Sequence, residues 1–211
     1  MRSFHEQPAI EPFHYQNQMK VWDSRAVFTH QLTSVLRTAP GVVLLCIGTD
    51  RCTGDALGPV TGSMLQENNP RFFSIYGTLA APVHALNLEE TLQFISKKHG
   101  NAPVLAIDAS LGAEQKIGRF TFASGPVYPG SAVQKTLPPA GDMHITGIVN
   151  ARGGKEFQTL QNTRLYRIWQ MADYLADCLL LADRRLAVRL QPAASRLDTR
   201  LYGSSTEDIH A

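Results

Sequence analysis

Apolar and polar positions follow two periods along the chain, and the change from one to the other predicts the order of strands and helices. Residues 42–45, 72–77 and 104–108 are short apolar runs, typical of buried parallel strands. Between them, residues 60–67 and 88–99 fit helices, the second with apolar positions recurring on one face. This alternation predicts an α/β domain of three layers, a mostly parallel sheet with helices on both faces.

The flanking segments follow the same periods. A helix is expected from about residue 23, where a capping side chain stands, to the residues before Pro40. Residues 117–122 alternate like a short strand, whereas residues 143–149 fit a strand or a helix. Residues 156–186 repeat their apolar positions helically, which predicts one long helix or a broken pair.

Length and chain ends indicate one domain with tails. The 211 residues, 44% of them hydrophobic, are enough for a single substantial core. Residues 1–22 show no period and predict a poorly ordered N-terminal arm. Residues 189–211 are rich in Pro, Ser and Arg and predict a basic, disordered tail. The α/β domain is therefore expected at residues 23–188.

Composition narrows the function mainly by exclusion. The formal charge of +2, from 20 basic and 18 acidic residues, gives no reason to expect nucleic acid or a membrane as a partner. The cysteines, Cys46, Cys52 and Cys178, lack the spacing of a zinc site and suit a reducing compartment. No apolar run matches a signal peptide or a membrane span. We therefore expect a cytoplasmic protein.

Two acids follow predicted strands. Asp55 lies in the loop after the first strand, and Asp108 ends the third. If these strands are neighbours, the carboxylates meet, retain one proton between them, and provide a general base and a general acid for activating water. Plainer interpretations are that Asp55 caps the following helix and that Asp108 pairs with an arginine such as Arg51. Asp50 is favoured as a turn former.

Converging carboxylates can also hold a divalent cation, the one cofactor that these residues suggest. His144 is the imidazole that would join Asp55 and Asp108 in such a metal site. The glycines of residues 48–58 match neither nucleotide-binding pattern. Four residues at the same predicted sheet edge are assigned to substrate binding: Gly48, Thr49, His84 and Ser110.

Several of these motifs together resemble the sporulation protein YyaC family. They lie in residues 46–59, 76–85, 106–109 and 141–147. That family is similar to the spore germination protease, an aspartic endopeptidase that degrades small acid-soluble spore proteins. The catalytic aspartates of that enzyme lie in an Asp-Ala-Leu-Gly-Pro element and an Ile-Asp-Ala element. The resemblance therefore implies catalytic roles for Asp55 and Asp108, which occupy those elements here.

A more distant similarity is to the hydrogenase maturation endopeptidases, which have a phosphorylase/hydrolase-like fold. These enzymes use an acid after the first strand, a strand-end aspartate and a histidine to grip nickel in their substrate. Their His-x-Thr-Gly element is matched by residues 144–147. The similarity therefore implies a metal-binding role for His144.

The resemblances imply a sporulation- or germination-associated peptidase that uses the Asp55 and Asp108 carboxylates. Its expected partners are protein or peptide substrates, such as small acid-soluble spore proteins, and further copies of itself in a homo-oligomer. Its expected place is the forespore or spore core. Two alternatives stay open: a non-catalytic peptide- or metal-binding protein on the same fold, and a metal-dependent hydrolase that uses Asp55, Asp108 and His144.

Overall fold

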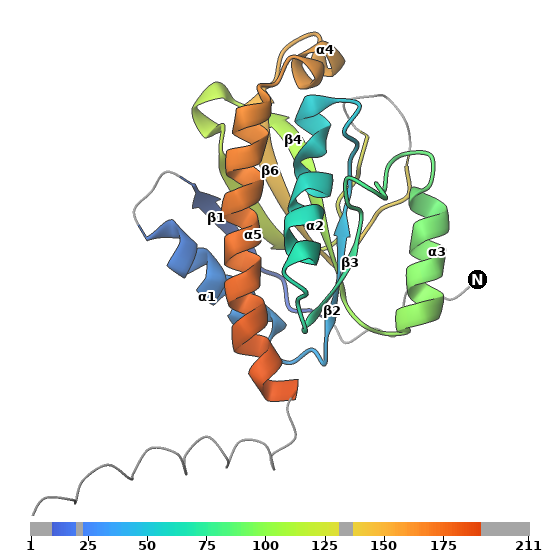
Figure 1. The fold of residues 1–211 in the computed structure, drawn as a ribbon. Helices are drawn as coiled ribbons and strands as arrows, with labels where there is room; N and C mark the ends of the chain where they lie inside the picture. The colour runs from blue at the N-terminus through green and yellow to red at the C-terminus, as the bar shows by residue number, and fades with distance from the viewer. Residues whose placement is uncertain (1–9, 20–22, 131–136, 191–211) are drawn as a thin grey trace, which may run out of the picture.

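A six-stranded mixed sheet runs through the domain in the computed structural model, which describes residues 10–19, 23–130 and 137–190. The strand order is β1-β5-β6-β4-β2-β3. Figure 1 shows this sheet behind helices that cross its face. Four strands are parallel: β2 (Val42–Cys46), β3 (Phe73–Tyr76), β4 (Val104–Gly112) and β6 (Met143–Ala151). At one edge, β5 (Arg119–Ser124) and β1 (His14–Gln18) add antiparallel. The mostly parallel α/β sheet predicted from the sequence is thereby confirmed.

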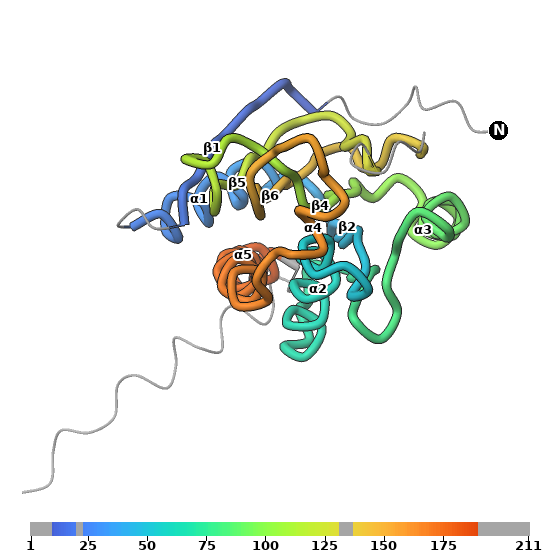
Figure 2. Tube along the Cα trace, turned by 90° about the horizontal axis from the view of Figure 1, so that it is seen from above, coloured from blue at the N-terminus to red at the C-terminus, as the bar shows by residue number. Residues whose placement is uncertain are grey.

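Helices cover both faces of this sheet. On one face, α1 (Ser24–Leu36), α2 (Leu57–Glu67) and α5 (Leu165–Ala187) bury their apolar side chains in one core with the sheet. On the other face, α3 (Leu88–His99) packs Leu88 and Ile95 against Val43 and Leu45 of β2. Figure 2 shows α3 set apart from α2 and α5. Short helical segments complete the fold: η1 (Thr53–Ala56), η2 (Glu114–Lys116), α4 (Glu156–Gln161) and η4 (Val188–Leu190).

A close approach between α2 and the end of β2 sets the position of the loop between them. A Cβ added to Gly58 would lie 2.2 Å from the carbonyl oxygen of Ile47. Only glycine therefore lets the first turn of α2 rest on the main chain that follows β2. Pro59 stands in the same first turn, where a missing N–H breaks no helical hydrogen bond.

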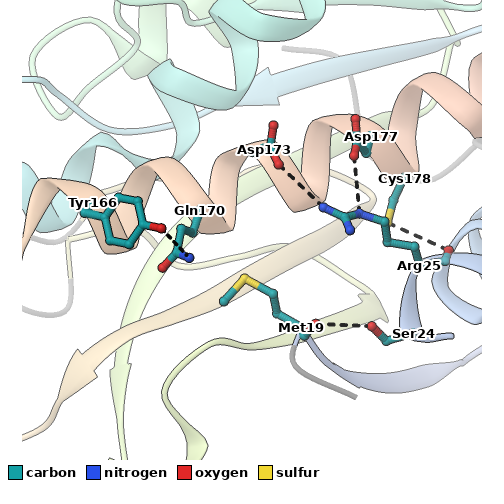
Figure 3. A network of polar contacts seen from close by, with 8 residues as sticks. All are labelled: Met19, Ser24, Arg25, Tyr166, Gln170, Asp173, Asp177 and Cys178. Carbon is teal, nitrogen blue, oxygen red and sulfur yellow. Dashed lines mark hydrogen bonds and ion pairs between the residues drawn. The ribbon is translucent and has the colours of Figure 1, made fainter. Parts of the chain in front are cut away.

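Arg25 links α1 to α5 on the helical face (Figure 3). Its guanidinium nitrogens lie 3.5 Å from Asp173 and 3.3 Å from Asp177, and its charge lies 5.2 Å from the ring centroid of Tyr174. The two ion pairs are half-exposed, so each adds little to stability. The buried Tyr174 ring stacks on Phe120 at 5.6 Å, and this apolar contact carries more of the helix-to-sheet packing.

The sheet extends further toward the N-terminus than the sequence pattern predicts. Residues 14–18 fall in the predicted poorly ordered arm of residues 1–22, yet they form β1 and pair with β5. The strand escapes detection because its side chains are mostly polar. Its one aromatic residue, Tyr15, lies 6.2 Å from Phe122 between ring centroids. Residues 1–9 of the predicted arm and residues 191–211 of the predicted tail lie outside the described residues.

The structure decides between the alternatives that the sequence left for two segments. Residues 143–149 belong to a strand, β6, and residues 156–186 form the broken pair α4 and α5. Asn87 stands at the start of α3 without capping it, because its side-chain oxygen accepts the N–H of His84 at 2.8 Å. In the part of the chain that the structure describes, no helix is long and apolar enough to cross a membrane.

Candidate active site

Main-chain hydrogen bonds hold the loop after β2. The Gly48 N–H donates to the carbonyl oxygen of Val83 at 2.8 Å, and the Thr49 N–H donates to that of Asp55 at 3.2 Å. The Asp55 N–H donates to the carbonyl oxygen of Cys52 at 2.9 Å. These bonds close the loop on itself and tie it to the loop after β3, so Asp55 has a fixed place at the carboxyl edge of the sheet.

The Asp55 side chain does not cap a helix. Cys52 precedes η1 and Ala56 precedes α2, and neither helix start receives a side-chain cap. Burial raises the pKa of Asp55 to about 6, and the backbone N–H of Thr49 offsets part of that rise. This carboxyl is therefore mostly ionised at pH 7 and takes up a proton just below that pH.

Asp108 lies in β4 at the point where β2 has ended. The last residues that β2 and β4 pair are Cys46 and Ile107. The sequence pattern predicted Asp108 at the tip of its strand, and this is wrong, because β4 continues to Gly112 and Asp108 lies inside it. Asp108 nevertheless lies just past the last residue of β4 that pairs with β2. Its side chain is 8% exposed, and one carboxyl oxygen accepts the N–H of Ala109 at 2.9 Å.

Asp55 and Asp108 form an electrostatically coupled pair. Burial and then the charge of Asp55 raise the pKa of Asp108 to about 8, while the hydrogen bond from Ala109 acts in the opposite direction. A carboxylate has this effect only on a near neighbour. None of the ion pairs among the described residues includes Asp108, so Arg51 does not neutralise it. At pH 7 the pair therefore holds one proton between its two carboxyls.

His144 stands apart from this pair. In β6 it pairs with Ala106, whereas Asp108 pairs with Thr146. The main chain of His144 is thus offset from that of Asp108 by one pleat repeat along the strand direction, about 6–7 Å. Its Nδ1 is hydrogen-bonded to the carbonyl oxygen of Gly125 at 2.9 Å.

The predicted metal-ligand set is consequently not assembled. Within residues 10–19, 23–130 and 137–190, no three or more His, Cys, Asp or Glu side chains are grouped to hold a metal ion. The register explains the difference for Asp55, Asp108 and His144: a His-x-Thr-Gly element places its threonine, not its histidine, level with Asp108.

The four predicted substrate-binding residues separate into three positions. The Thr49 N–H donates to the Asp55 carbonyl oxygen, and Gly48 lies directly against that same carbonyl. Ser110 lies two residues beyond Asp108 on the same face of β4, where its hydroxyl donates to the carbonyl oxygen of Gly147 at 3.3 Å. The Nδ1 of His84 accepts the N–H of Leu86 at 3.2 Å, in a groove beside β3.

This groove was missed by reasoning from the sequence. Its volume is about 680 Å³, and its wall includes Ile75, Tyr76, Val83, His84 and Phe94. Neither Asp55 nor Asp108 lines it. The groove exists because β3 is an edge strand and α3 lies beside it, and strand order cannot be read from local periodicity. One signal was present: Phe94 lies off the predicted apolar face of its helix.

Comparison with known proteins gives three similarities. A family model described as "Protein of unknown function (DUF1256)" matches residues 13–178. "Uncharacterized protein YyaC" of Bacillus subtilis strain 168 is 49% identical over 155 residues, which cover 72% of this chain and 76% of that protein. The NiFe hydrogenase maturation protease HycI of Thermococcus kodakarensis KOD1 superposes with a TM-score of 0.51 at 20% identity. That match covers 73% of this chain and 99% of HycI, and at this identity it shows a shared α/β fold alone.

Proposed function

Because the chain belongs to the DUF1256 family of YyaC-like proteins and has the α/β fold of a maturation protease, we propose that it is a peptidase. In this proposal Asp55 and Asp108 are the catalytic residues. Peptide-bond hydrolysis needs one group that removes a proton from water and one that donates a proton to the amide. Two carboxyls that share a proton supply both groups.

The protonation state of the pair carries the proposal. Burial holds the pKa of Asp108 near 8 and that of Asp55 near 6, so their preferred states differ at pH 7. Asp55 is then the base: its carboxylate accepts a proton as the water oxygen attacks the peptide carbonyl carbon. Asp108 is the acid: its hydroxyl donates to the carbonyl oxygen, whose charge grows as the tetrahedral intermediate forms.

Collapse of the intermediate completes the cycle. The proton held on Asp55 passes to the leaving amine nitrogen as the carbon–nitrogen bond breaks. The proton on the former carbonyl oxygen returns to Asp108. The pair thus ends with the one proton with which it began, and the products are a carboxylic acid and an amine.

Small acid-soluble spore proteins are the proposed substrates, and the forespore or spore core is the proposed place of action. Both proposals rest on the resemblance to the germination protease, as does assembly into a homo-oligomer. Light scattering on the purified protein tests the last of these, since the mass in solution is either that of one 23.2 kDa chain or a multiple of it.

The test of the peptidase uses purified wild-type protein, Asp55→Asn and Asp108→Asn with small acid-soluble spore proteins at pH 7. Asp50→Asn is the matched control, because Asp50 is an exposed acid in the same loop. New termini found by mass spectrometry should fall at least about 100-fold in the two site variants and stay within a factor of about 3 in the control. Equal cleavage by wild type and Asp108→Asn would remove the pair from catalysis. Peptide binding without cleavage by wild type would favour the non-catalytic alternative.

A further inference from the structure

We propose that the open edge of β3 takes an extended segment of the substrate as an added strand and so delivers the following residues to Asp55 and Asp108. The proposal rests on the proposed peptidase function only for what happens after docking. It assigns a binding role to the groove beside β3, which the two acids do not line. The occupant is a peptide in β conformation, because main-chain groups are what this edge presents.

β3 pairs on one side only in the described sheet, so alternate N–H and C=O groups of its main chain make no hydrogen bond to another strand. In the described sheet β3 is paired with β2 alone. The Val42 N–H donates to the carbonyl oxygen of Phe72, which fixes the alternation of this parallel ladder. The N–H and C=O groups of Ser74 and Tyr76 therefore face β2, and those of Ile75 face away. An edge with such groups is a template for another strand.

Side chains along the edge add an apolar wall. Phe94 of α3 is 51% exposed, and its ring centroid lies 6.1 Å from that of Tyr76. The Lys98 ammonium lies 5.5 Å from the Phe94 ring centroid and 5.8 Å from that of Tyr76. A strand paired with Ile75 would place alternate side chains against this aromatic wall. Apolar residues at those alternate positions are accordingly the preferred ligands.

The groove is continuous with the loop that carries Asp55. Val83 and His84, which follow β3 in the chain, are among its lining residues. Val83 is bridged to Ile47, and its carbonyl oxygen accepts the N–H of Gly48, which contacts Asp55. A segment that leaves the groove beside Val83 enters the carboxyl edge of the sheet.

Strand spacing sets the distance that the substrate must span between the docked segment and the two acids. From an added strand to β4 there are three strand spacings, about 14 Å in all. At about 3.3 Å per extended residue, four to five residues cover that distance. The cleaved bond is therefore expected about four to five residues from the docked segment.

Binding is tested without hydrolysis on Asp108→Asn. A phage-displayed library of random dodecapeptides is selected on this variant, and the enriched sequences are synthesised with a fluorescent label. Their affinity is then measured by anisotropy in the Asp108→Asn background. Phe94→Glu should weaken binding at least about tenfold, because it places a charge on the apolar wall. The matched control is Phe157→Glu, since Phe157 of α4 is 49% exposed and does not line the groove.

Two further measurements address the main chain of Ile75. Ile75→Pro removes the N–H of residue 75, which points away from β2 and makes no hydrogen bond to it. This substitution should weaken peptide binding at least about tenfold. The control Ile75→Val keeps the N–H and should leave the affinity unchanged. Amide hydrogen exchange should slow at Ile75 on peptide binding and stay unchanged at Ser74 and Tyr76. The exchange measurement uses the unaltered edge, so it decides the matter even where Ile75→Pro fails to fold.

Three results would overturn the proposal: no enriched peptide, equal affinity in Phe94→Glu and Phe157→Glu, or no added protection at Ile75. A different result would reject the proposed peptidase activity while leaving the docking proposal standing. Wild-type protein that binds the selected peptides at the β3 edge, but never cleaves longer forms of them, would end the catalytic proposal and leave the docking edge in place.

Discussion

Gly48 lies directly against the main chain of Asp55. A Cβ added to Gly48 would be 1.9 Å from the carbonyl oxygen of Asp55, and the φ angle of Gly48 is 138°. Both the space and the backbone conformation exclude a side chain at this position. The residue predicted from the sequence to bind substrate therefore has a structural part in the site, because it sets where the proposed catalytic base stands.

Replacing Gly48 with alanine should damage the fold as well as the site. The close contact with Asp55 and the positive φ together predict a loss of about 3 kcal/mol or more in the free energy of unfolding. Chemical denaturation monitored by circular dichroism measures it. Gly153→Ala is the control, because an added Cβ there meets nothing within 4 Å, and its stability should change by less than about 0.5 kcal/mol. Equal effects of the two substitutions would contradict this account of the loop.

The raised pKa of Asp108 predicts a pH-dependent gain in stability for Asp108→Asn. In the folded state this pKa rises from 3.8 to about 8, so the carboxyl favours folding only while it stays protonated. Its contribution is complete below pH 4 and is lost as the pH rises toward 8. Asparagine carries no charge at any of these pH values. The variant should therefore be more stable than wild type at pH 9, by on the order of 2 kcal/mol, and lose that advantage at pH 4.

Denaturation curves at pH 4, 7 and 9 for wild type, Asp108→Asn and Asp50→Asn provide the comparison. Asp50 is exposed, so its substitution should give no comparable trend. A stability difference between wild type and Asp108→Asn that is the same at all three pH values would show that Asp108 is not held neutral by the fold.

The proposed mechanism predicts a bell-shaped pH dependence of kcat/KM. Activity should fall below about pH 6 as Asp55 gains a proton and above about pH 8 as Asp108 loses one, which leaves a maximum near pH 7. Initial rates on one peptide substrate between pH 4 and 10 test it. A rate that keeps rising to pH 10 is incompatible with Asp108 as the acid.

Local patterns predicted most of the fold because burial shows in each element's own sequence, as a continuous apolar run in a strand buried on both faces and as one apolar face in a helix. The strand of residues 42–45 and the helix of residues 88–99 were found in this way, since their periods need no knowledge of their neighbours. β1 was missed because pairing with β5, rather than its own composition, makes it a strand.

Strand ends can be read from the sequence, whereas strand register cannot, and the candidate site depends on both. β2 and β4 are adjacent, as the βαβ alternation suggested, and the charge of Asp55 acts on Asp108 across their ends, while the catalytic role of the pair stays a proposal. His144 was misplaced because a shift of two residues along β6, invisible in the sequence, separates it from Asp108. The groove beside Ile75 was missed because it exists only once β3 is known to be an edge strand.

His144→Ala should leave catalysis nearly intact. Its main chain is offset from that of Asp108 by one pleat repeat and its Nδ1 is hydrogen-bonded to the carbonyl of Gly125, so loss of the imidazole should change kcat by less than about threefold. The unpaired Gly125 carbonyl should cost about 1 kcal/mol of stability. Rates with and without a chelator, together with denaturation curves, measure both effects. Activity that disappears in His144→Ala and returns on adding nickel or zinc would restore the metal-site hypothesis.

The most direct test of the account is a pH titration of the side-chain carboxyl carbons of Asp55 and Asp108 by carbon-13 NMR in wild type and in Asp55→Asn. The coupled pair predicts two transitions well above the ordinary aspartate pKa of 3.8, near 6 and near 8. It also predicts that the transition of Asp108 moves to lower pH in Asp55→Asn, because the neighbouring charge is gone. Two independent transitions near pH 4, with Asp108 unchanged by the substitution, would contradict it.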